Sequence, residues 1–585
     1  MRAIIVLFFL IFTSVRWVES GSFHVMVKGS PSGNGSVNNP WDLQTALSHP
    51  DRVSPGDTIW IHGGTYEGEY QSYLTGSSQA PILVRNVPGE NVVIDGVKYR
   101  DLNGILQIEG ENTWYMGLTV TNSSPERIEY LGQVIDTEGV TILGENNKLI
   151  NCIIHNCGGN GVGFWSTALH SEVYGCIIYN NGSIGPSRGH GHGIYSQNNE
   201  GIKLIRDNIL FNSFSLGIHI YSEGGNIRGY HIEGNMMFNN GLPGNGFLER
   251  HILVGGGRPA EQITIKSNYL YNRPEQYAKS GIQLGYSNAD NVDAVCSSNI
   301  LGNCSFYVIK GWNSVLFSNN LVYAYNTSSQ LLDFDEYDNI TYPDYHNNQY
   351  FRGEFSSRTF DEWKQITGQD QSSSYSSNLP QKTVTFLRKN LYEPGRAHLA
   401  VYNFEKLNAV EVDLSDLLEA GSGYEVYDVN NLQAGPIVTG VYNGGRISVP
   451  MNLTEVEKPQ GNVPDEGLFV HTAPDFGVFL ITGPLGKPID QSEAASLRIL
   501  NYYPNPTADL MSVDFFSSLN NRVTVEVVDS MGRIVNSEFY FAKEGTNKYV
   551  VNLSAYPAGF YLINFQENHN NVSCKVLKIN FTLQR

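Results

Sequence analysis

The sequence is poor in charged residues, and the charge that it carries is mostly negative. Only 16% of its 585 residues are Asp, Glu, Lys or Arg, and the formal net charge is −19. No basic patch stands out, so a nucleic-acid partner is not expected. Gly, Asn, Tyr and Ser are abundant instead, which is typical of an extended β protein rather than a helical one.

Long hydrophobic runs and cysteine motifs are also scarce. The first twenty residues, "MRAIIVLFFLIFTSVRWVES", have a positive start at Arg2 and an apolar run that is too short to span a bilayer. We therefore expect residues 1–20 to be a secretory signal peptide, and no later stretch is long enough to cross a membrane. Six cysteines do not make a disulfide scaffold in a chain of this length, and no C-x-x-C or Cys/His cluster indicates zinc.

The middle of the chain contains a repeat. Six segments recur in the order "NCIIHN", "GCIIYN", "DNILFN", "GNMMFN", "SNYLYN" and "SNILGN", with spacings of 24 to 33 residues. No unit has a helical period long enough for a crossover helix. The simplest fold is a right-handed parallel β-helix in which each repeat forms one coil of three short strands, stacked on its neighbours.

Asn recurs at two positions of the repeat. Because Asn tolerates positive φ, we expect the earlier set to lie at tight bends, and stacked amides can also hydrogen-bond along the helix axis; this set is Asn208, Asn235, Asn268 and Asn299. Cys152 and Cys176 take the same position in their units, which favours buried, stacked thiols.

The first strand of each coil can be aligned as "GVGFW", "GIYSQ", "GIHIY", "HILVG", "GIQLG", "SFYVI" and "LDFDE". Strand alternation then places one apolar set inward, namely Val162, Ile194, Ile218, Ile252, Ile282, Phe306 and Leu332, together with Phe164, Ile220, Val254, Leu284, Val308 and Phe334. The outward set is aromatic and polar. Rings that stack on sugar faces and amides that bind hydroxyls predict a glycan-binding groove formed by Trp165, Tyr195, Gln197, Gln283 and Tyr307. The alternative is an ordinary solvated sheet face.

The stretch "RGHGHGIYSQN", residues 188–198, lies on the turn that leads into one of these strands. Its glycines would let the turn approach a substrate closely. With two groups from the neighbouring coil, it provides the predicted catalytic set of Arg188, His190, His192, His219 and Tyr221. The alternative is a Gly-rich turn whose histidines only cap neighbouring coils.

Residues 22–370 resemble the pectate-lyase-like superfamily of secreted β-helix proteins. The resemblance is carried by "FHVMVKGSPSGNGSVNNPWDLQTAL", "VSPGDTIWIHGGTY" and "APILVRNVPGENVVIDG". It implies that the long turn and the first sheet form a polysaccharide cleft. The paired Asp and Asn-Thr-Asp signatures that accompany "GHG" in polygalacturonases are missing. No cofactor is identified, and calcium stays an open alternative that no acidic cluster supports.

Two further regions follow. From about Lys382 apolar and polar residues alternate over several runs, as in "AVEVDLSDLL", and "FGVFLITG" closes the region near Gly483. This pattern predicts a β-sandwich at residues 381–483, followed by a polar linker at 484–496. Residues 497–585 resemble the C-terminal sorting domain of type IX secretion substrates in Bacteroidota. The matching residues are Tyr503, Pro504, Asn505, Pro506, Asp529, Gly532, Arg533, Gly559 and Tyr561. This resemblance implies export through the periplasm and outer membrane, with release or surface attachment.

The sequence thus predicts an all-β chain: a capped parallel β-helix at residues 21–375, a β-sandwich, and a small β-sandwich sorting domain. We expect a secreted or surface-attached monomer whose partners are a polysaccharide and the type IX machinery.

The favoured activity is a polysaccharide lyase for a uronate-containing glycan, because cations, histidines and tyrosines can neutralise a carboxylate and move a carbon-bound proton. One alternative is a glycoside hydrolase that uses Glu223, Asp333 and Asp335. The other is a non-catalytic glycan-binding protein.

Overall fold

The computed structural model describes residues 20–96, 103–129, 135, 137–222, 225–244, 250–275, 278–287, 290–334, 340–464, 467–484, 497–503, 507, 509–517, 521–529, 533–543, 545–567 and 570–578. This part of the chain is almost entirely β structure, as predicted. Its two α-helices are α1 (Leu43–Leu47) and α2 (Phe360–Thr367). No helix among these residues is long and apolar enough to cross a membrane.

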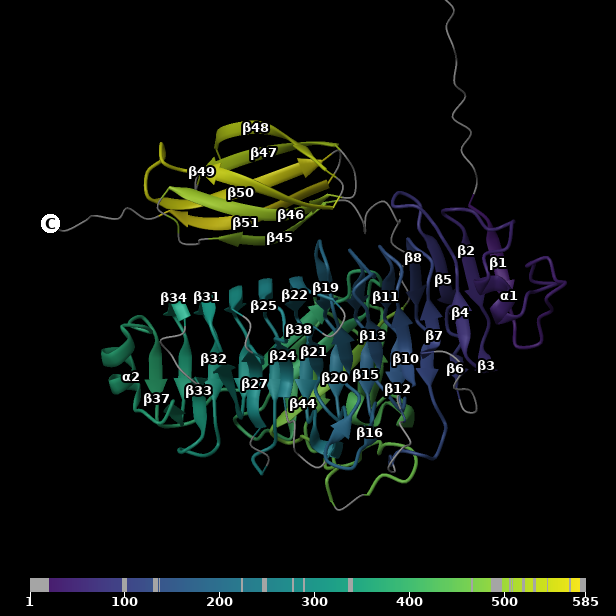
Figure 1. Ribbon diagram of the computed structural model, residues 1–585, viewed down its shortest axis with the longest axis horizontal. Coiled ribbons are helices and arrows are strands. Elements are labelled where there is room, and N and C mark those ends of the chain that lie inside the picture. The colour runs from purple at the N-terminus through teal and green to yellow at the C-terminus, as the bar shows by residue number, and fades with distance from the viewer. Residues whose placement is uncertain are drawn as a thin grey trace, which may run out of the picture.

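Three long parallel sheets wind around one axis (Figure 1). Sheet I consists of β4 (Tyr70–Ser72), β7 (Gly104–Ile108), β10 (Glu138–Ile142), β13 (Val162–Phe164), β18 (Ile194–Ser196), β21 (Ile218–Ile220), β24 (Arg250–Val254), β27 (Ala278–Leu284), β30 (Cys304–Val308), β33 (Gln330–Phe334) and β36 (Glu354–Phe355). Sheet II consists of β1 (Ser22–Val25), β2 (Thr58–Ile61), β5 (Ile82–Asn86), β8 (Thr113–Met116), β11 (Lys148–Ile150), β14 (Glu172–Tyr174), β19 (Lys203–Arg206), β22 (Ile227–Glu233), β25 (Ala260–Lys266), β28 (Asn291–Ser297), β31 (Trp312–Ser318) and β34 (Ile340–His346).

Sheet III completes each coil. Its strands are β3 (Gly64–Glu67), β6 (Val92–Asp95), β9 (Thr119–Thr121), β12 (Ile153–His155), β15 (Ile177–Tyr179), β20 (Ile209–Phe211), β23 (Met236–Phe238), β26 (Tyr269–Tyr271), β29 (Ile300–Gly302), β32 (Leu321–Tyr323), β35 (Gln349–Phe351) and β37 (Ser374–Ser376). The turn from sheet III to sheet I is the longest in several coils. One such turn holds a short hairpin of β16 (Ser183–Ile184) and β17 (Gly189–His190).

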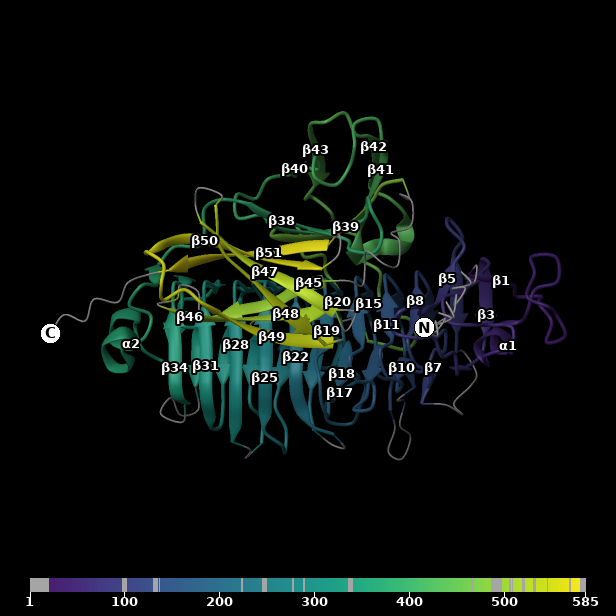
Figure 2. The same cartoon turned by 90° about the horizontal axis from the view of Figure 1, so that it is seen from above.

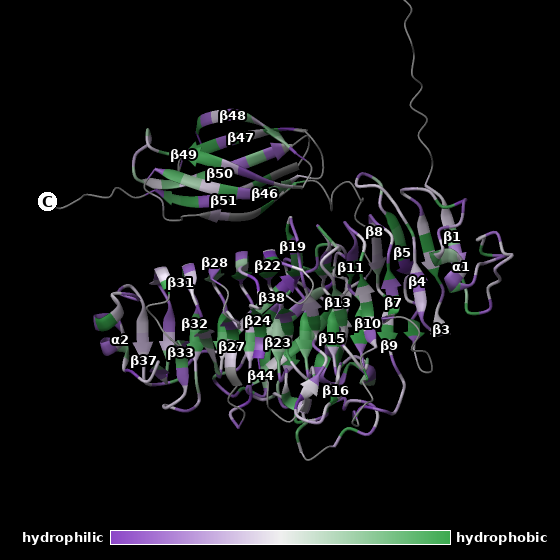
Figure 3. Ribbon diagram, in the orientation of Figure 1, coloured by the Kyte–Doolittle hydropathy of each residue, from purple (hydrophilic) through white to green (hydrophobic). Residues whose placement is uncertain are grey.

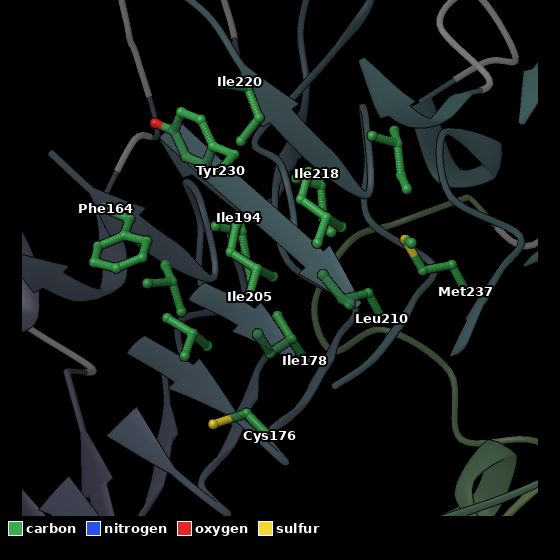
Figure 4. Close-up of a cluster of buried hydrophobic side chains, with 14 of the residues drawn as sticks. Phe164, Cys176, Ile178, Ile194, Ile205, Leu210, Ile218, Ile220, Tyr230 and Met237 are labelled. Atoms are coloured by element: carbon green, nitrogen blue, oxygen red, sulfur yellow. The ribbon is translucent and has the colours of Figure 1, made fainter. Parts of the chain in front are cut away.

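The predicted inward set of the first strands is confirmed. Val162, Ile194, Ile218, Ile252, Ile282, Phe306 and Leu332 pair in register along sheet I. All seven side chains are fully buried. Figure 4 shows how Phe164, Ile194 and Ile218 converge with Ile178, Ile205 and Leu210 from the other two sheets. A continuous apolar column therefore fills the coils.

A ladder of buried asparagines joins the coils along the axis. Each Asn side-chain oxygen accepts from the backbone N–H of the Asn in the preceding coil, at 2.9–3.0 Å, through Asn208, Asn235, Asn268, Asn299, Asn320 and Asn348. Cys176 N–H donates to Asn208, and Cys152 and Cys176 are buried free thiols as expected. The amide ladder is confirmed.

The predicted bend positions are wrong by one residue. Positive φ belongs to the residue before each ladder Asn: Asp207 (55°), Gly234 (72°), Ser267 (54°) and Ser298 (58°). The ladder Asn must turn its amide into the interior, so the preceding residue makes the bend. The later Asn of the repeat does have positive φ, for example Asn180 (55°) and Asn212 (51°).

Sheet III is covered on both faces along its middle strands, from β12 to β35. Its outward side chains, among them Tyr179, Phe211 and Phe238, form a buried cluster with residues of the β-sandwich such as Tyr402 and Phe476. The rings of Tyr179, Phe211 and Phe238 stack at centroid distances of 4.9 and 4.6 Å. This explains why the repeat segments are apolar at successive positions instead of alternating. In Figure 2 the sandwich strands lie along one flank of the β-helix.

Two antiparallel regions complete the chain. The sandwich pairs β38 (Val384–Lys389), β39 (Ala397–Tyr402), β44 (Phe476–Thr482), β41 (Gly423–Asp428) and β42 (Val438–Val441), with β40 (Ala409–Asp413) and β43 (Arg446–Pro450) opposite. The C-terminal region pairs β45 (Leu497–Tyr503), β46 (Leu510–Ser517) and β49 (Gly545–Asn552), and also β48 (Ile534–Ala542), β47 (Asn521–Asp529), β50 (Gly559–Glu567) and β51 (Asn570–Lys578). Both regions have their own apolar cores. Figure 3 shows apolar and polar residues interspersed along the strands of the C-terminal region.

The ladder gives a stability prediction. Asn235→Leu removes the acceptor of the buried Asn208 N–H and the donor to Ile205 O, so it should destabilise the β-helix by about 1–3 kcal/mol. Unfolding followed by circular dichroism measures the change. Asn313→Leu, at an exposed position of β31, is the matched control and should have little effect. Equal stability of the two variants would show that the ladder contributes nothing.

Candidate functional site

The outward residues of sheet I form a connected row of rings. The ring centroids of Trp165 and Tyr195 are 5.5 Å apart, those of Tyr195 and His219 are 5.4 Å apart, and those of His219 and Tyr221 are 5.0 Å apart. Tyr221 then contacts Tyr286 at 5.6 Å, and Tyr286 is 47% exposed. Four residues predicted from the alignment therefore lie together, and Tyr286 extends the row into solvent.

His192 and His219 form a hydrogen-bonded pair within this row. His192 Nδ1 accepts from the backbone N–H of Leu216 at 3.1 Å, so the proton of a neutral His192 is on Nε2. His192 Nε2 lies 3.0 Å from His219 Nδ1. The Nε2–H of His192 therefore donates a hydrogen bond to His219 Nδ1. A neutral His219 therefore carries its own proton on Nε2. The pair fixes one N–H donor on the half-buried ring of His219.

Burial and nearby cations keep both rings neutral. Burial lowers the pKa of His219 to about 3, with Arg188 and Arg250 acting in the same direction. Burial also lowers the pKa of His192 well below its ordinary value, and His219, Arg188 and His190 add to the effect. Arg250 is a residue that the sequence reasoning missed. Burial lowers its pKa, against the influence of Tyr286 and Tyr307. Two guanidinium groups are thus close to the His219 ring.

His190 belongs to a separate dyad. Its Nδ1 lies 2.7 Å from Glu129 Oε2, and Glu129 is a buried carboxylate that also accepts from Ser183 Oγ at 2.7 Å. The dyad orients His190 with Nδ1–H toward the carboxylate and leaves Nε2 as a proton acceptor. The side chain of His190 is 32% exposed. Glu129 was not predicted, because it lies in a long turn without periodicity.

Two buried groups that sequence reasoning missed hold Trp165. Glu138 is 4% exposed and accepts from Trp165 Nε1 at 3.3 Å, from Asn160 Nδ2 at 2.9 Å and from Thr141 Oγ1 at 2.6 Å. A Cβ on Gly163 would overlap this carboxylate, so only glycine fits there. From below, the ammonium of Lys203 donates to the carbonyl oxygens of Phe164, Trp165 and Gln197.

The remaining predicted residues are more scattered. Gln197 and Gln283 are each 1% exposed, and their amides donate to Tyr195 OH and Gly285 O rather than facing solvent. Tyr307 lies on β30 and is half-buried. Asp333 is four strands from His219 in the register of sheet I, or about 19 Å at 4.8 Å per strand. Glu223 and Asp335 lie outside the described residues.

The described residues contain no group of three or more His, Cys, Asp or Glu side chains that could hold a metal ion. Two carboxylates that contact site residues, Glu129 and Glu138, are already hydrogen-bonded by side chains. The donor set of these described residues therefore does not fit a calcium site.

The depressed pKa of His219 predicts a pH dependence of stability. The unfolded chain protonates this residue near pH 6.5, but the folded chain does so only near pH 3. The neutral ring's contribution to stability is therefore present above pH 6.5 and is lost as the pH falls toward 3. His219→Asn should flatten the decline of the melting temperature over this window, whereas His170→Asn, at an exposed histidine, should leave it unchanged. An unaltered decline in His219→Asn would contradict the assignment.

Comparison with known proteins agrees with the β-helix fold and with the C-terminal region. Residues 23–251 match the family model described as "Pel9A-like, right handed beta helix region", and residues 501–579 match that of the "Secretion system C-terminal sorting domain". Pectate lyase L from Thermoclostridium stercorarium is 23% identical over 306 residues, covering 49% of this chain and 22% of that protein. Pectate lyase PEL9 from Emericella nidulans is 31% identical over 111 residues, covering 17% of this chain and 27% of that protein.

The chain therefore spans about a quarter of the length of the curated relatives that it matches. Among solved structures, pectate lyase Pel9A aligns with a TM-score of 0.34 and 15% identity, over 61% of this chain and 79% of that one. The sorting domain directs the protein through the type IX system to the cell surface or the extracellular space. The chain thus carries a Pel9A-like right-handed β-helix region, followed by a secretion-system C-terminal sorting domain.

Proposed function

We propose that the protein is a polysaccharide lyase that cleaves a uronate-containing glycan on the outer face of sheet I. The observation that carries this proposal is the His192–His219 pair, which fixes a neutral N–H donor among aromatic rings and two arginines. The family match and the two pectate lyase relatives support the same class of reaction.

The reaction needs three groups. The uronate carboxylate must be neutralised, so that the neighbouring C5–H becomes acidic. A base takes the C5 proton, the electron pair of that bond forms the C4–C5 double bond, and the C4–O bond breaks. The leaving oxygen then takes up a proton. No water enters the products.

Residues of the site can supply each group. Arg188, Arg250 and the Nε2–H of His219 bind the carboxylate. His190 is the base, because Glu129 holds its Nδ1–H and leaves Nε2 to accept a proton. The hydroxyl of Tyr221, next to His219, protonates the leaving oxygen. His192 orients His219, and Trp165, Tyr195 and Tyr286 stack on sugar rings. The buried glutamines support this surface from below.

The two alternatives predict other outcomes. A hydrolase needs two carboxylates within about 5–9.5 Å across the scissile bond. Asp333 lies about 19 Å along sheet I from His219, away from the ring row, and Glu129 and Glu138 are held by side-chain donors. A protein that only binds glycans would need the ring row but not the dyad.

Single substitutions test the assignment. His190→Ala and His219→Ala should lower the turnover of a uronate glycan by about 10²–10⁴-fold, and His192→Ala should lower it through misorientation of His219. Turnover is measured from the ultraviolet absorbance of the unsaturated product on a glycan panel. Tyr342→Ala, at an exposed ring on β34, is the control. Wild-type turnover in all three histidine variants would contradict this assignment. Glu223, Asp333 and Asp335 would then be the candidate catalytic residues.

Deletion of residues 497–585 separates catalysis from export. The C-terminal strands have their own core, so the truncated protein should keep the turnover of the full chain. It should stay in the periplasm of the native host, because the sorting domain is lost. Fractionation and immunoblotting follow its location. Surface delivery of the truncated protein would contradict the export role.

A further inference from the structure

A loop of the β-sandwich reaches the turn that carries Glu129. We call residues 456–464, between β43 and β44, the strap. Glu457 anchors one end, since its N–H donates to Asn430 O at 2.6 Å and its carboxylate accepts from Tyr179 OH at 3.0 Å. Further along, the N–H of Gln460 donates to Asn156 Oδ1 at 2.9 Å. The strap thus runs along the ends of β12 and β15.

The far end of the strap binds the chain just before Glu129. Asn462 N–H donates to Pro125 O at 2.9 Å, and Asn462 Oδ1 accepts from Arg127 N–H at 2.8 Å. Gly461 lies directly against this segment with φ +94°, and a Cβ there would overlap Pro125 O and the Arg127 side chain. The strap therefore fixes the backbone of residues 125–127 from the outside.

The same segment is fixed from the inside. The Arg127 guanidinium is buried, donates to Gly182 O at 2.8 Å and to Asn180 O at 2.6 Å, and lies over the Phe214 ring. Its backbone then pairs with β16: Ile184 N–H donates to Arg127 O at 2.7 Å, and Glu129 N–H donates to Ile184 O at 2.8 Å. β16 pairs with β17, where Ser183 lies opposite His190.

These contacts form one continuous path from the sandwich to the dyad. The path runs from Asn462 to Arg127, on to Glu129, and from its carboxylate to His190 Nδ1. Two of these steps are hydrogen bonds, and the step from Arg127 to Glu129 is two residues along the chain. Because β16 and β17 have only two residues each, the hairpin has little pairing of its own to hold His190 in place.

We propose that the strap is a positioning element of the active site, with Asn462 and Gly461 as the positioning residues that hold Glu129 behind His190. The sandwich then does more than cover sheet III, because it completes the geometry of the base. The catalytic part of this proposal rests on the lyase function proposed above. The structural part, that the strap maintains the Glu129–His190 hydrogen bond, does not.

The test uses the full chain with ¹⁵N-labelled histidine. The Nδ1–H of His190 bonded to Glu129 gives a strongly downfield proton resonance, which Glu129→Gln and His190→Gln assign by its shift and its loss. Asn462→Ala and Gly461→Ala should weaken or abolish this resonance. They should lower kcat by about 10- to 100-fold with KM unchanged, because a small misplacement of a base mainly affects the chemical step.

Two controls separate positioning from general damage. Asn462→Asp keeps the side-chain oxygen that accepts from Arg127 and should retain both the resonance and kcat. Glu455→Ala, at an exposed position just before the strap, should behave like the wild type. Melting temperatures close to that of the wild type show that the variants are folded.

The outcomes are distinct. An unchanged resonance and kcat in both Asn462→Ala and Gly461→Ala would overturn the positioning role. Equal loss in Asn462→Asp and Asn462→Ala would also overturn it, since the acceptor oxygen would then be irrelevant. The two proposals can also fail separately. If the strap variants lose the resonance, the structural part is supported. If the wild-type protein produces no unsaturated sugar, the proposed lyase function is overturned.

Discussion

The stacking register of the coils is the constraint on which the rest of the structure depends. Each coil hydrogen-bonds to the next through three parallel sheets, and the asparagine ladder fixes the same register from the interior. A slip by one residue in a sheet I strand would turn its inward apolar side chains outward, and a slip at the ladder would unpair a buried amide. The register therefore decides which residues of successive coils lie side by side. His192, Tyr195 and His219 meet on the outer face because Tyr195 pairs with His219 in adjacent strands.

The outer faces of sheet I and sheet III differ in polarity. Sheet III carries stacked rings outward and is closed by the sandwich, so its strands are apolar on both sides. Sheet I carries rings together with histidines, and cations approach it from the preceding turns. Neutral imidazoles beside guanidinium groups suit an anionic substrate, because binding its charge requires no proton uptake by the histidines. Buried groups such as Glu138 and Lys203 hold Trp165 and the strand beside it from behind, which would reduce the rearrangement needed in the proposed sugar complex.

Periodicity explains what could be predicted from the sequence. The strands of sheet I repeat with a clear apolar alternation, so their register and the positions of Trp165, Tyr195, His219 and Tyr221 follow directly. The predicted bend positions were wrong by one residue, because both Asp207 and Asn208 are compatible with a turn. Only the inward orientation of the Asn208 amide, which the sequence does not show, decides between them. Glu129, Glu138 and Arg250 come from turns or strand ends that carry no period. The contact between Arg127 and Asn462 spans 335 residues, and no local pattern in either segment indicates it.

Elimination at a uronate and hydrolysis differ in the fate of solvent oxygen. A glycan that the protein cleaves is digested in water enriched in heavy oxygen, and the products are weighed by mass spectrometry. Elimination breaks the C4–O bond without adding water. We therefore expect one unsaturated end for each bond broken, on only one of the two fragments, and no heavy oxygen incorporated by the cleavage itself. One heavy oxygen atom incorporated for each bond broken, with no unsaturated end, would identify hydrolysis and rule out elimination.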